Sequence, residues 1–457
     1  MALLPIVPRP LIQFRPLGLV LIAVAVLLPL VWFVPLAARD PIAVAGQYFG
    51  SLALILMGLS QFMATRWPGV EVVFGGMDRV YVLHKWTGIA VIAFILLHDA
   101  VGAEIRGLGD KSALEDFAKT LGEFSYYGFL ILAGLSIAMI IPYSLWRWTH
   151  RFMGAFFALS AFHFAFIAKP FSLTDPPGLY VGAFCVLGLV SYAYTLLPLR
   201  RWLAARAFVV EAVERTGGAL AVTLAPKGGN LRHRAGQFAF LRFGLPGLGE
   251  AHPFTISSAP RADGKLRFSI KSPGDWSSEL PYKLQAGVAV WVDGPYGHFT
   301  RRTSAVADIW IAGGIGITPF LAWAGAMLPE SPDAHLFYSV RNRADAPHLD
   351  QLEALASQKP NLHLHLIESA VTGRLDAGYI QQATGADLRR THVYFCGPTA
   401  MREGLQDGLE RLGLRAARFH YERFEMRTGI GLWRLVVWSA DAILQRLARK
   451  PAVGGQK

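Results

Sequence analysis

The segment YVLHKWTGIAVIAFILLHDA, residues 81–100, is an apolar stretch of helical length that contains two histidines, His84 and His98. An imidazole in hydrocarbon is costly and usually faces a protein interior or a functional group. A second apolar stretch, WRWTHRFMGAFFALSAFHFAFIAKP at 146–170, contains His150 and His163. One such histidine is as easily a hydrogen-bonded core residue, but two pairs at similar spacing indicate a shared role.

The spacing within each pair predicts how the imidazoles are arranged. Fourteen residues of helix rise about 21 Å and return to within about 40° of the starting direction, so His84 and His98 share a face. The thirteen-residue spacing of His150 and His163 ends about 140° away, so local tightening, a kink or a side-chain swing must supply the difference. Zinc or copper would need ligands converging on one point, and a proton relay would not need two matched depths. Because neutral imidazole is a good axial ligand of haem iron, the pattern predicts two non-covalent, bis-histidine haems at different depths.

The composition restricts the class of protein. The chain has 457 residues, of which 53% are hydrophobic and 17% charged, which is too apolar for an ordinary soluble enzyme. After about residue 200 it is too polar to be only a membrane domain, so we expect two or three domains. The two cysteines, Cys185 and Cys396, exclude a disulfide framework and a cysteine zinc site, and no C-x-x-C-H sequence offers covalent haem attachment.

Six apolar segments are close to the roughly 20 residues that cross a bilayer: 17–37, 44–64, 81–101, 123–142, 151–169 and 177–197. We interpret the first as an uncleaved helix, because its apolar run is longer than that of a usual signal peptide. Basic residues lie before the first segment and after the second, fourth and sixth, whereas residues 99–123 contain six acids against three bases. The positive-inside rule therefore predicts that both termini and the C-terminal half are cytoplasmic.

This topology assigns the net charge of +12 to membrane orientation and not to nucleic-acid binding. It also places His84 and His150 at the inner depth, and His98 and His163 at the outer depth. Lys85 and Arg151 directly follow the inner histidines. Their side chains could meet haem propionates or extend to the lipid interface.

The second half of the chain has a different sequence pattern. Short alternating strands with glycine turns begin near residue 207 and predict an antiparallel β-barrel. After residue 305 the pattern becomes α/β with a parallel sheet, starting with a buried strand, a glycine turn and a helix opened by Thr318 and Pro319. Gly313, Gly314 and Gly316 in that turn would let the backbone approach a pyrophosphate, although tight strand-to-helix turns also use glycine.

Five motifs in order make the pattern specific: HPFTISSAP (252–260), GDWSSEL (274–280), DGPYG (293–297), GGIGITPF (313–320) and CGPTAM (396–401). Together they resemble the flavin and nicotinamide domains of ferredoxin-reductase-type enzymes. With the histidine pairs before them, the chain resembles the NADPH oxidase/ferric reductase superfamily over roughly residues 50–427.

The resemblance implies roles for individual residues. The flavin ring and ribityl chain would be held by His252, Pro253, Phe254 and Thr255, and the FAD pyrophosphate by Ser277. The nicotinamide dinucleotide phosphates would lie against the segment from Gly313 to Pro319. Cys396, Gly397 and Pro398 would lie near the nicotinamide, and Phe424 would cover the flavin ring, although here some 33 residues follow it.

The predicted activity is transmembrane electron transfer from NADPH through FAD and two b-type haems to a small molecule at the outer face, with oxygen giving superoxide. A flavin is needed between a two-electron donor and a one-electron acceptor. Ferric chelate as the acceptor, or a periplasmic redox protein supplied by this chain, remain open, as does a protein partner. Arg341 and Arg343 follow a predicted strand without a nearby acid, which favours NADPH over NADH because guanidinium grips a 2′-phosphate.

The predicted domains are a transmembrane haem-binding six-helix domain at 1–200, an FAD-binding β-barrel at 207–302 and an NAD(P)H-binding α/β domain at 305–427. Residues 428–457 form an amphipathic tail, which we expect to brace the cytoplasmic domains against the membrane. We expect an integral protein of the bacterial inner (plasma) membrane.

Overall fold

The computed structural model describes residues 15–38, 40–102, 113–138, 141, 143–197, 205–271, 280–302 and 307–422. The expected positions of Ser277, Phe424 and the tail at 428–457 lie outside these residues. The chain divides into two compact units. One unit holds the described residues within 1–21, 63–83 and 193–424, and the other those within 22–62 and 84–192.

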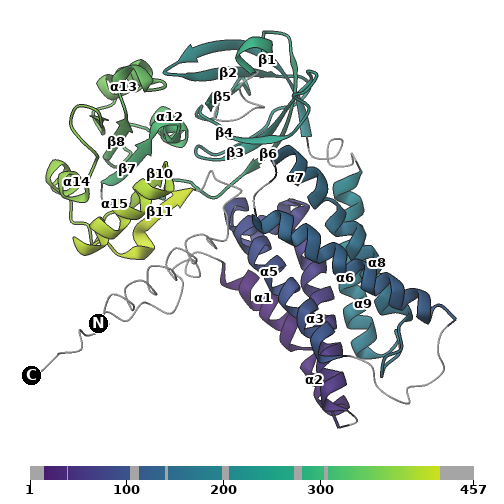
Figure 1. Cartoon of the computed structure of the whole chain (residues 1–457). Coiled ribbons are helices and arrows are strands. Elements are labelled where there is room, and N and C mark those ends of the chain that lie inside the picture. The colour runs from purple at the N-terminus through teal and green to yellow at the C-terminus, as the bar shows by residue number, and fades with distance from the viewer. Residues whose placement is uncertain are drawn as a thin grey trace, which may run out of the picture. The chain divides into compact units, whose positions relative to one another are not determined.

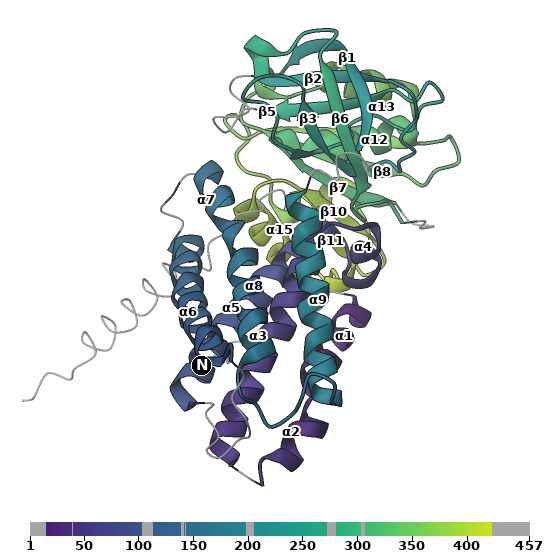
Figure 2. The ribbon, with the colours of Figure 1, turned by 90° about the vertical axis from the view of Figure 1, so that its right-hand side faces the viewer.

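The N-terminal part of the chain is helical. Its helices are α1 (Pro16–Leu27), α2 (Leu30–Leu36), α3 (Pro41–Ala64), α4 (Pro68–Phe74), α5 (Met77–Val101), α6 (Glu115–Ala138), α7 (Tyr143–His150), α8 (Phe152–Phe166) and α9 (Pro176–Leu196). The long helices α3, α5, α6, α8 and α9 run side by side (Figures 1 and 2). Their shared core includes Ile55, Phe157 and Val181, all completely buried.

Five segments of the described chain are long and apolar enough to cross a membrane: Pro16–Leu36, Pro41–Ala64, Met77–Val101, Glu115–Ile137 and Pro176–Leu196. The predicted number of six is not confirmed. The span expected at 151–169 corresponds to α8, which has 15 residues and is separated from α7 at Arg151. A helix of 15 residues is shorter than the roughly 20 residues needed to cross the hydrocarbon core.

An antiparallel sheet follows the helices. Its strands are β1 (Ala205–Thr216), β2 (Ala219–Pro226), β3 (Phe238–Phe243), β4 (His252–Thr255), β5 (Leu266–Lys271) and β6 (Ala289–Tyr296), in the order β4-β3-β6-β1-β2-β5. Gly217 and Gly218 join β1 to β2 with φ of +48° and +72°, as the tightest hairpin turns require. The two ends of the sheet meet at a bridge between Ile256 and Phe268. The expected closed barrel is therefore not confirmed, because β4 and β5 at the two ends of the sheet do not form a continuous ladder. The sheet is a partly closed half-barrel.

A parallel sheet completes the described chain. Its strands are β7 (Asp308–Gly313), β8 (Ala334–Val340), β9 (Leu362–Glu368), β10 (Val393–Cys396) and β11 (Phe419–Glu422), in the order β11-β10-β7-β8-β9. The helices α12 (Thr318–Ala326), α13 (Leu349–Gln358), α14 (Ala377–Thr384) and α15 (Thr399–Arg411) cover its faces (Figure 1). Buried clusters lie on both faces of the sheet, as parallel strands require. The expected α/β fold with a parallel sheet is confirmed.

Candidate functional site

The four histidines lie on three helices of the helical part. His84 and His98 are on α5, His150 ends α7, and His163 is on α8. The backbone between α7 and α8 is tightened, because Arg151 N bonds to Trp148 O (3.3 Å) and Gly154 N to Arg151 O (3.3 Å), both three residues back. Such turns rotate the chain further per residue than an α-helix does. The tightening therefore acts in the direction that the thirteen-residue spacing needs.

The structure brings His84 and His150 together. Their ring centroids are 6.1 Å apart, and the ring planes meet at 67°. This separation can accommodate one metal atom bound by a nitrogen of each ring at about 2 Å. A helix pair that presents two imidazoles in this way fits the axial ligation of haem iron.

Main-chain carbonyls fix the tautomer of three of the histidines. The Nδ1 atoms of His84, His98 and His163 lie 3.1, 2.8 and 2.9 Å from the carbonyl oxygens of Ser60, Gly46 and Ala118. A carbonyl oxygen only accepts, so each Nδ1 donates its proton and each Nε2 keeps a free lone pair. The Nδ1 of His84 also lies 2.9 Å from Ser60 Oγ, which accepts from it as well. This arrangement is the usual support of a metal-bound histidine.

His150 reaches the same state through a serine. Its Nδ1 lies 3.3 Å from Ser136 Oγ, which donates to Leu132 O (2.8 Å) and accepts from Trp146 Nε1 (3.1 Å). Because the serine proton is already used, Ser136 Oγ accepts from His150 Nδ1. All four imidazoles therefore offer Nε2 to a ligand-binding position.

Two glycines make room for the outer histidines. A Cβ added at Gly50 would lie 2.9 Å from His98 Nδ1, and one added at Gly122 would lie 2.5 Å from His163 Nδ1. Each imidazole therefore packs directly against the backbone of a neighbouring helix, α3 or α6. These glycines give each histidine a cradle that any larger residue would fill, which the histidine spacing did not reveal.

Gly122→Ala is expected to displace His163 and to lower by at least half the occupancy of the outer haem that the histidine pattern predicts. The added methyl must be accommodated in a packed interior, where overpacking costs about 1–3 kcal/mol. Haem per chain and the reduced-minus-oxidised spectrum measure the result. Gly134→Ala on the same helix is the matched control, because a Cβ there meets nothing within 4 Å. Equal haem content in the two variants would contradict this role of Gly122.

Lys85 and Arg151 flank the inner histidines in different environments. Lys85 is half-buried and Arg151 is exposed. A contact with a haem propionate stays a prediction for both.

The residues expected to hold the flavin form strand β4. Its partner is β3, with His252 opposite Leu241 and Thr255 opposite Phe238. Thr255 is 4% exposed, and its hydroxyl has no hydrogen-bond partner among the described residues. A buried hydroxyl without a partner is costly, so it fits a position that a bound ligand satisfies. His252 Nε2 lies 3.3 Å from Glu250 Oε2.

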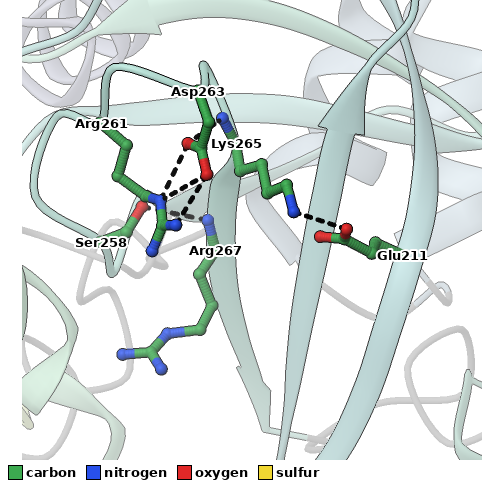
Figure 3. Close-up of polar contacts among 6 residues, drawn as sticks. All are labelled: Glu211, Ser258, Arg261, Asp263, Lys265 and Arg267. Carbon is green, nitrogen blue, oxygen red and sulfur yellow. Dashed lines mark hydrogen bonds and ion pairs between the residues drawn. The ribbon is translucent and has the colours of Figure 1, made fainter.

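The charged residues near the turn before β5 pair with one another. Arg261 forms an ion pair with Asp263 (2.7 Å), and Lys265 with Glu211 (2.6 Å) (Figure 3). Exposed pairs of this kind contribute little to stability. They are surface pairs, and none of the expected flavin residues takes part in them.

The expected nucleotide residues meet at the carboxyl ends of the parallel strands. Gly313 ends β7, residues Gly314–Ile317 form a 3₁₀ turn, and Thr318 and Pro319 begin α12. A Cβ added at Gly313 would lie 2.7 Å from Pro398 Cδ, so this turn packs against the segment Cys396–Pro398 after β10. Ligands of open parallel sheets bind at this edge.

Cys396 is completely buried at the end of β10. Burial, and secondarily the Glu422 carboxyl, raise the pKa of its thiol well above the usual value. The side chain is therefore a neutral thiol, which is a poor nucleophile. At the predicted nicotinamide position it would act by contact rather than by nucleophilic attack.

Glu422 is a candidate residue of the nucleotide site that was not predicted from the sequence. It pairs with Cys396 across β10 and β11, is 8% exposed, and its Oε2 has no partner among the described residues. Burial, together with the neighbouring acids Asp78 and Glu71, raises the pKa of its carboxyl well above the usual range. The available signal was an acid in the apolar strand FHYE, next to the expected nicotinamide position.

The two arginines after β8 differ. The guanidinium of Arg343 forms an ion pair with Glu353, and its backbone N donates to Glu368 Oε2 (2.8 Å). Arg341 is exposed at the end of the strand. Arg343 also lines a cavity of about 750 Å³ with Arg215 and Arg267. Arg343 is exposed as well, but Glu353 already engages its guanidinium, so Arg341 stays the predicted partner of a further anion.

Three parts of the chain match known families. Residues 49–161 match the ferric reductase like transmembrane component, 209–300 an FAD-binding domain and 310–407 the oxidoreductase NAD-binding domain. The chain has the architecture of the NADPH oxidase/ferric reductase superfamily. As a chain of this architecture, it is an integral membrane oxidoreductase with binding domains for FAD and NAD(P)H.

Similar proteins include electron-transfer components of dioxygenases. The chain is 30% identical over 204 residues to the 2-halobenzoate 1,2-dioxygenase electron transfer component of Burkholderia cepacia, covering 42% of this chain and 59% of that protein. It is 30% identical over 200 residues to the toluate 1,2-dioxygenase electron transfer component of Pseudomonas putida, covering 41% and 58%. The matches therefore span less than two thirds of these relatives. The FAD/NAD-binding domain of a nitric oxide dioxygenase from Vibrio cholerae O1 biovar El Tor aligns over 48% of this chain and 99% of its own, with 22% identity and a TM-score of 0.43.

Proposed function

We propose that this chain transfers electrons from cytosolic NADPH through FAD and two b-type haems to oxygen at the outer face, giving superoxide. The observation that carries the proposal is the set of four imidazoles whose Nδ1 atoms are held by hydrogen bonds, leaving Nε2 available. His84 and His150 would hold the inner haem, and His98 and His163 the outer one. The proposal includes a sixth span at residues 151–169, which contains α8, and cytoplasmic termini in a bacterial inner membrane.

Each proposed domain has its own role. The haem-binding domain is 1–200, the FAD-binding domain 207–302 and the NAD(P)H-binding domain 305–427, followed by the tail 428–457. When bound, FAD accepts two electrons at once and passes them on singly. β4 and Ser277 would hold the flavin, and Phe424 would cover it. The segment Gly313–Pro319 would bind the dinucleotide phosphates, while Cys396, Gly397 and Pro398 line the nicotinamide position. His98 and His163 would hold the outer haem, which would supply single electrons to the acceptor.

Arg341→Ala is expected to lower catalytic efficiency with NADPH by roughly 10- to 100-fold and to leave the efficiency with NADH unchanged. The reason is the loss of a charge-assisted hydrogen bond to the 2′-phosphate, worth about 1.5–3 kcal/mol. Steady-state flavin reduction with both nucleotides measures the difference. Arg343→Ala is the matched control, with a smaller expected effect because Glu353 already engages that guanidinium. Equal efficiencies with both nucleotides before and after Arg341→Ala would contradict the assignment.

The acceptor is tested on the purified chain. NADPH oxidation in air with trapping of superoxide, and NADPH oxidation without oxygen in the presence of a ferric chelate, separate the two small-molecule acceptors. We expect superoxide in air at a rate that accounts for most of the NADPH consumed. Ferrous chelate as the dominant product would support the second candidate, ferric reduction, which the matched transmembrane family favours by its description. Turnover that requires an added redox protein would support electron donation to a partner, the role that the dioxygenase components carry in their names.

A further inference from the structure

Glu71 is a buried carboxyl on α4, in the segment Met63–Leu83, which belongs to the same compact unit as the two sheets. The residue is 8% exposed. Its Oε1 accepts two backbone N–H groups, from Met77 at 2.9 Å and from Gly297 at 3.0 Å. Met77 begins α5, and Gly297 directly follows β6. One carboxyl oxygen therefore joins the start of α5 to the end of a strand of the flavin-binding sheet.

A second contact joins the same segment to the same sheet. The Arg66 guanidinium lies 3.8 Å from the centre of the Phe240 ring, on β3. Arg66 adopts a φ of 54°, which is strained for a residue with a side chain. Such strain persists only where the surroundings hold the residue in place. The contact surface on the sheet is an aromatic cluster of Phe238, Phe240 and Tyr296, with ring centres 5.7–6.0 Å apart.

The N–H of Gly297 depends on Glu71. The carbonyl of Gly297 is satisfied separately, by Gln237 Nε2 at 3.2 Å. A buried N–H without an acceptor is costly, so loss of the Glu71 side chain would leave Gly297 unsatisfied unless water entered. The hydrogen bond from Gly297 N to Glu71 Oε1 therefore holds the end of β6 to this segment.

Glu71 has both acidic and basic neighbours. Asp78 on α5 and Glu422 on β11 face it, and Glu422 Oε1 lies 3.6 Å from the position of a Cβ at Gly297. On the basic side, Arg15 is exposed and donates to the Val72 carbonyl (2.7 Å). Arg79 on α5 and His298 after β6 complete the surroundings. The Asp78 carboxylate and the scarcity of solvent disfavour a negative charge on Glu71.

Burial is the largest influence and raises the pKa of Glu71 to about 7, with a further contribution from Asp78. The N–H bonds from Gly297 and Met77, and the Arg15 charge, act in the opposite direction and are outweighed. The carboxyl in its held position thus binds a proton more tightly than the same carboxyl in water, whose pKa is 4.5.

We propose that Glu71 is a positioning residue that holds the segment Met63–Leu83 on the flavin-binding sheet, and that it holds the segment more firmly when protonated. By linkage, the contribution of the proton is fully present below about pH 4.5 and is lost as the pH rises through about 7. The held segment continues directly into α5, the helix of His84 and His98.

The proposed reaction adds a consequence, which unlike the positioning role rests on the proposed function. Each NADPH oxidised to NADP⁺ releases two electrons and one proton, and the electrons leave for the outer face while the proton stays in the cytoplasm. Turnover would therefore favour the protonated, held state of Glu71.

Hydrogen–deuterium exchange on the purified full-length chain tests the proposal without any electron transfer. The readout is the protection of peptides containing Met77 and Gly297 between pH 6 and pH 8, corrected for intrinsic exchange rates. In the wild type, protection is expected to fall about tenfold over this range. Glu71→Gln keeps an oxygen acceptor without the charge, so its protection should stay high and flat. Glu71→Ala should show low protection at every pH.

The matched control is Glu211→Gln, which changes an exposed acid of the same sheet and should follow the wild-type pH profile. Two results would overturn the proposal: protection in the wild type that does not change with pH, or a Glu71→Gln variant as unprotected as Glu71→Ala. Either of these two results could be found in a chain that transfers electrons normally. Conversely, protection that falls with pH in the wild type could be found in a chain that transfers no electrons. Failure of the proposed function is therefore distinguishable from failure of this inference.

Discussion

Replacing His98 with leucine is expected to reduce the haem content from two to about one per chain and to stop electron transfer to the outer face. The imidazole of His98 is held by Gly46 O at 2.8 Å and packs against Gly50. Leucine offers no lone pair, and one remaining imidazole is a weaker hold on haem than two. Flavin reduction by NADPH should keep its wild-type rate, because the nucleotide residues lie in the other compact unit.

Haem is measured per bound flavin, and the two electron-transfer steps are separated by stopped-flow absorbance. Leu97→Ala is the matched control: it changes the adjacent residue of α5, which is 42% exposed. A His98→Leu variant with full haem content would refute the ligand assignment. Loss of haem in Leu97→Ala as well would show that any change in this part of α5 disturbs haem binding. The effect of His98→Leu would then not identify His98 as a ligand.

The sequence was sufficient where a local pattern determines the structure. The spacing of His84 and His98 on one helix follows from helical periodicity alone. The turn from Gly313 to Pro319 is predictable for the same reason, since a strand, a glycine turn and a helix succeed one another within some twenty residues. The parallel sheet follows from repetition of that pattern along the chain.

The supports of the histidines could not be predicted, because they come from distant parts of the chain. Gly46 lies 52 residues before His98, and Ala118 lies 45 residues before His163. Which carbonyl meets which imidazole depends on how α3 and α6 pack against their neighbours, and periodicity within one helix does not contain that information. Small residues are common in membrane helices, so the sequence does not distinguish Gly122 from the others. Its role becomes visible only when His163 is known to be its neighbour.

Two boundary predictions failed to be confirmed for physical reasons. Hydropathy predicts a span at 151–169, but α8 ends at Phe166, because Ile167 adopts an extended backbone. Alternation identifies the strands of the antiparallel sheet, yet closure depends on the pairing of β4 with β5, which is limited to the bridge at Ile256. Both features depend on backbone bonding between segments or turns and not on side-chain pattern.

Gly316→Ala is expected to raise the KM for NADPH strongly in flavin reduction while leaving the haem spectrum intact. A Cβ at Gly316 would lie 2.1 Å from the Cys396 carbonyl oxygen and 2.6 Å from its carbon. Both atoms belong to the backbone of β10, so neither can swing aside as a side chain would. The 3₁₀ turn must therefore move away from Cys396–Pro398, which separates the residues expected to bind the phosphates from those expected to line the nicotinamide.

The size of the effect follows from this geometry. Overpacking a core commonly costs about 1–3 kcal/mol. If this cost falls on the phosphate-binding turn, the KM for NADPH should rise by roughly 5- to 140-fold, since each 1.4 kcal/mol of binding energy is a factor of ten. Gly404→Ala on α15 of the same sheet domain is the matched control, because a Cβ there meets nothing within 4 Å. Chemical reduction by dithionite should still give the wild-type haem spectrum in both variants. Normal NADPH kinetics in Gly316→Ala would mean that the turn does not contact the dinucleotide, and the whole set from Gly313 to Pro319 would then have to be reassigned.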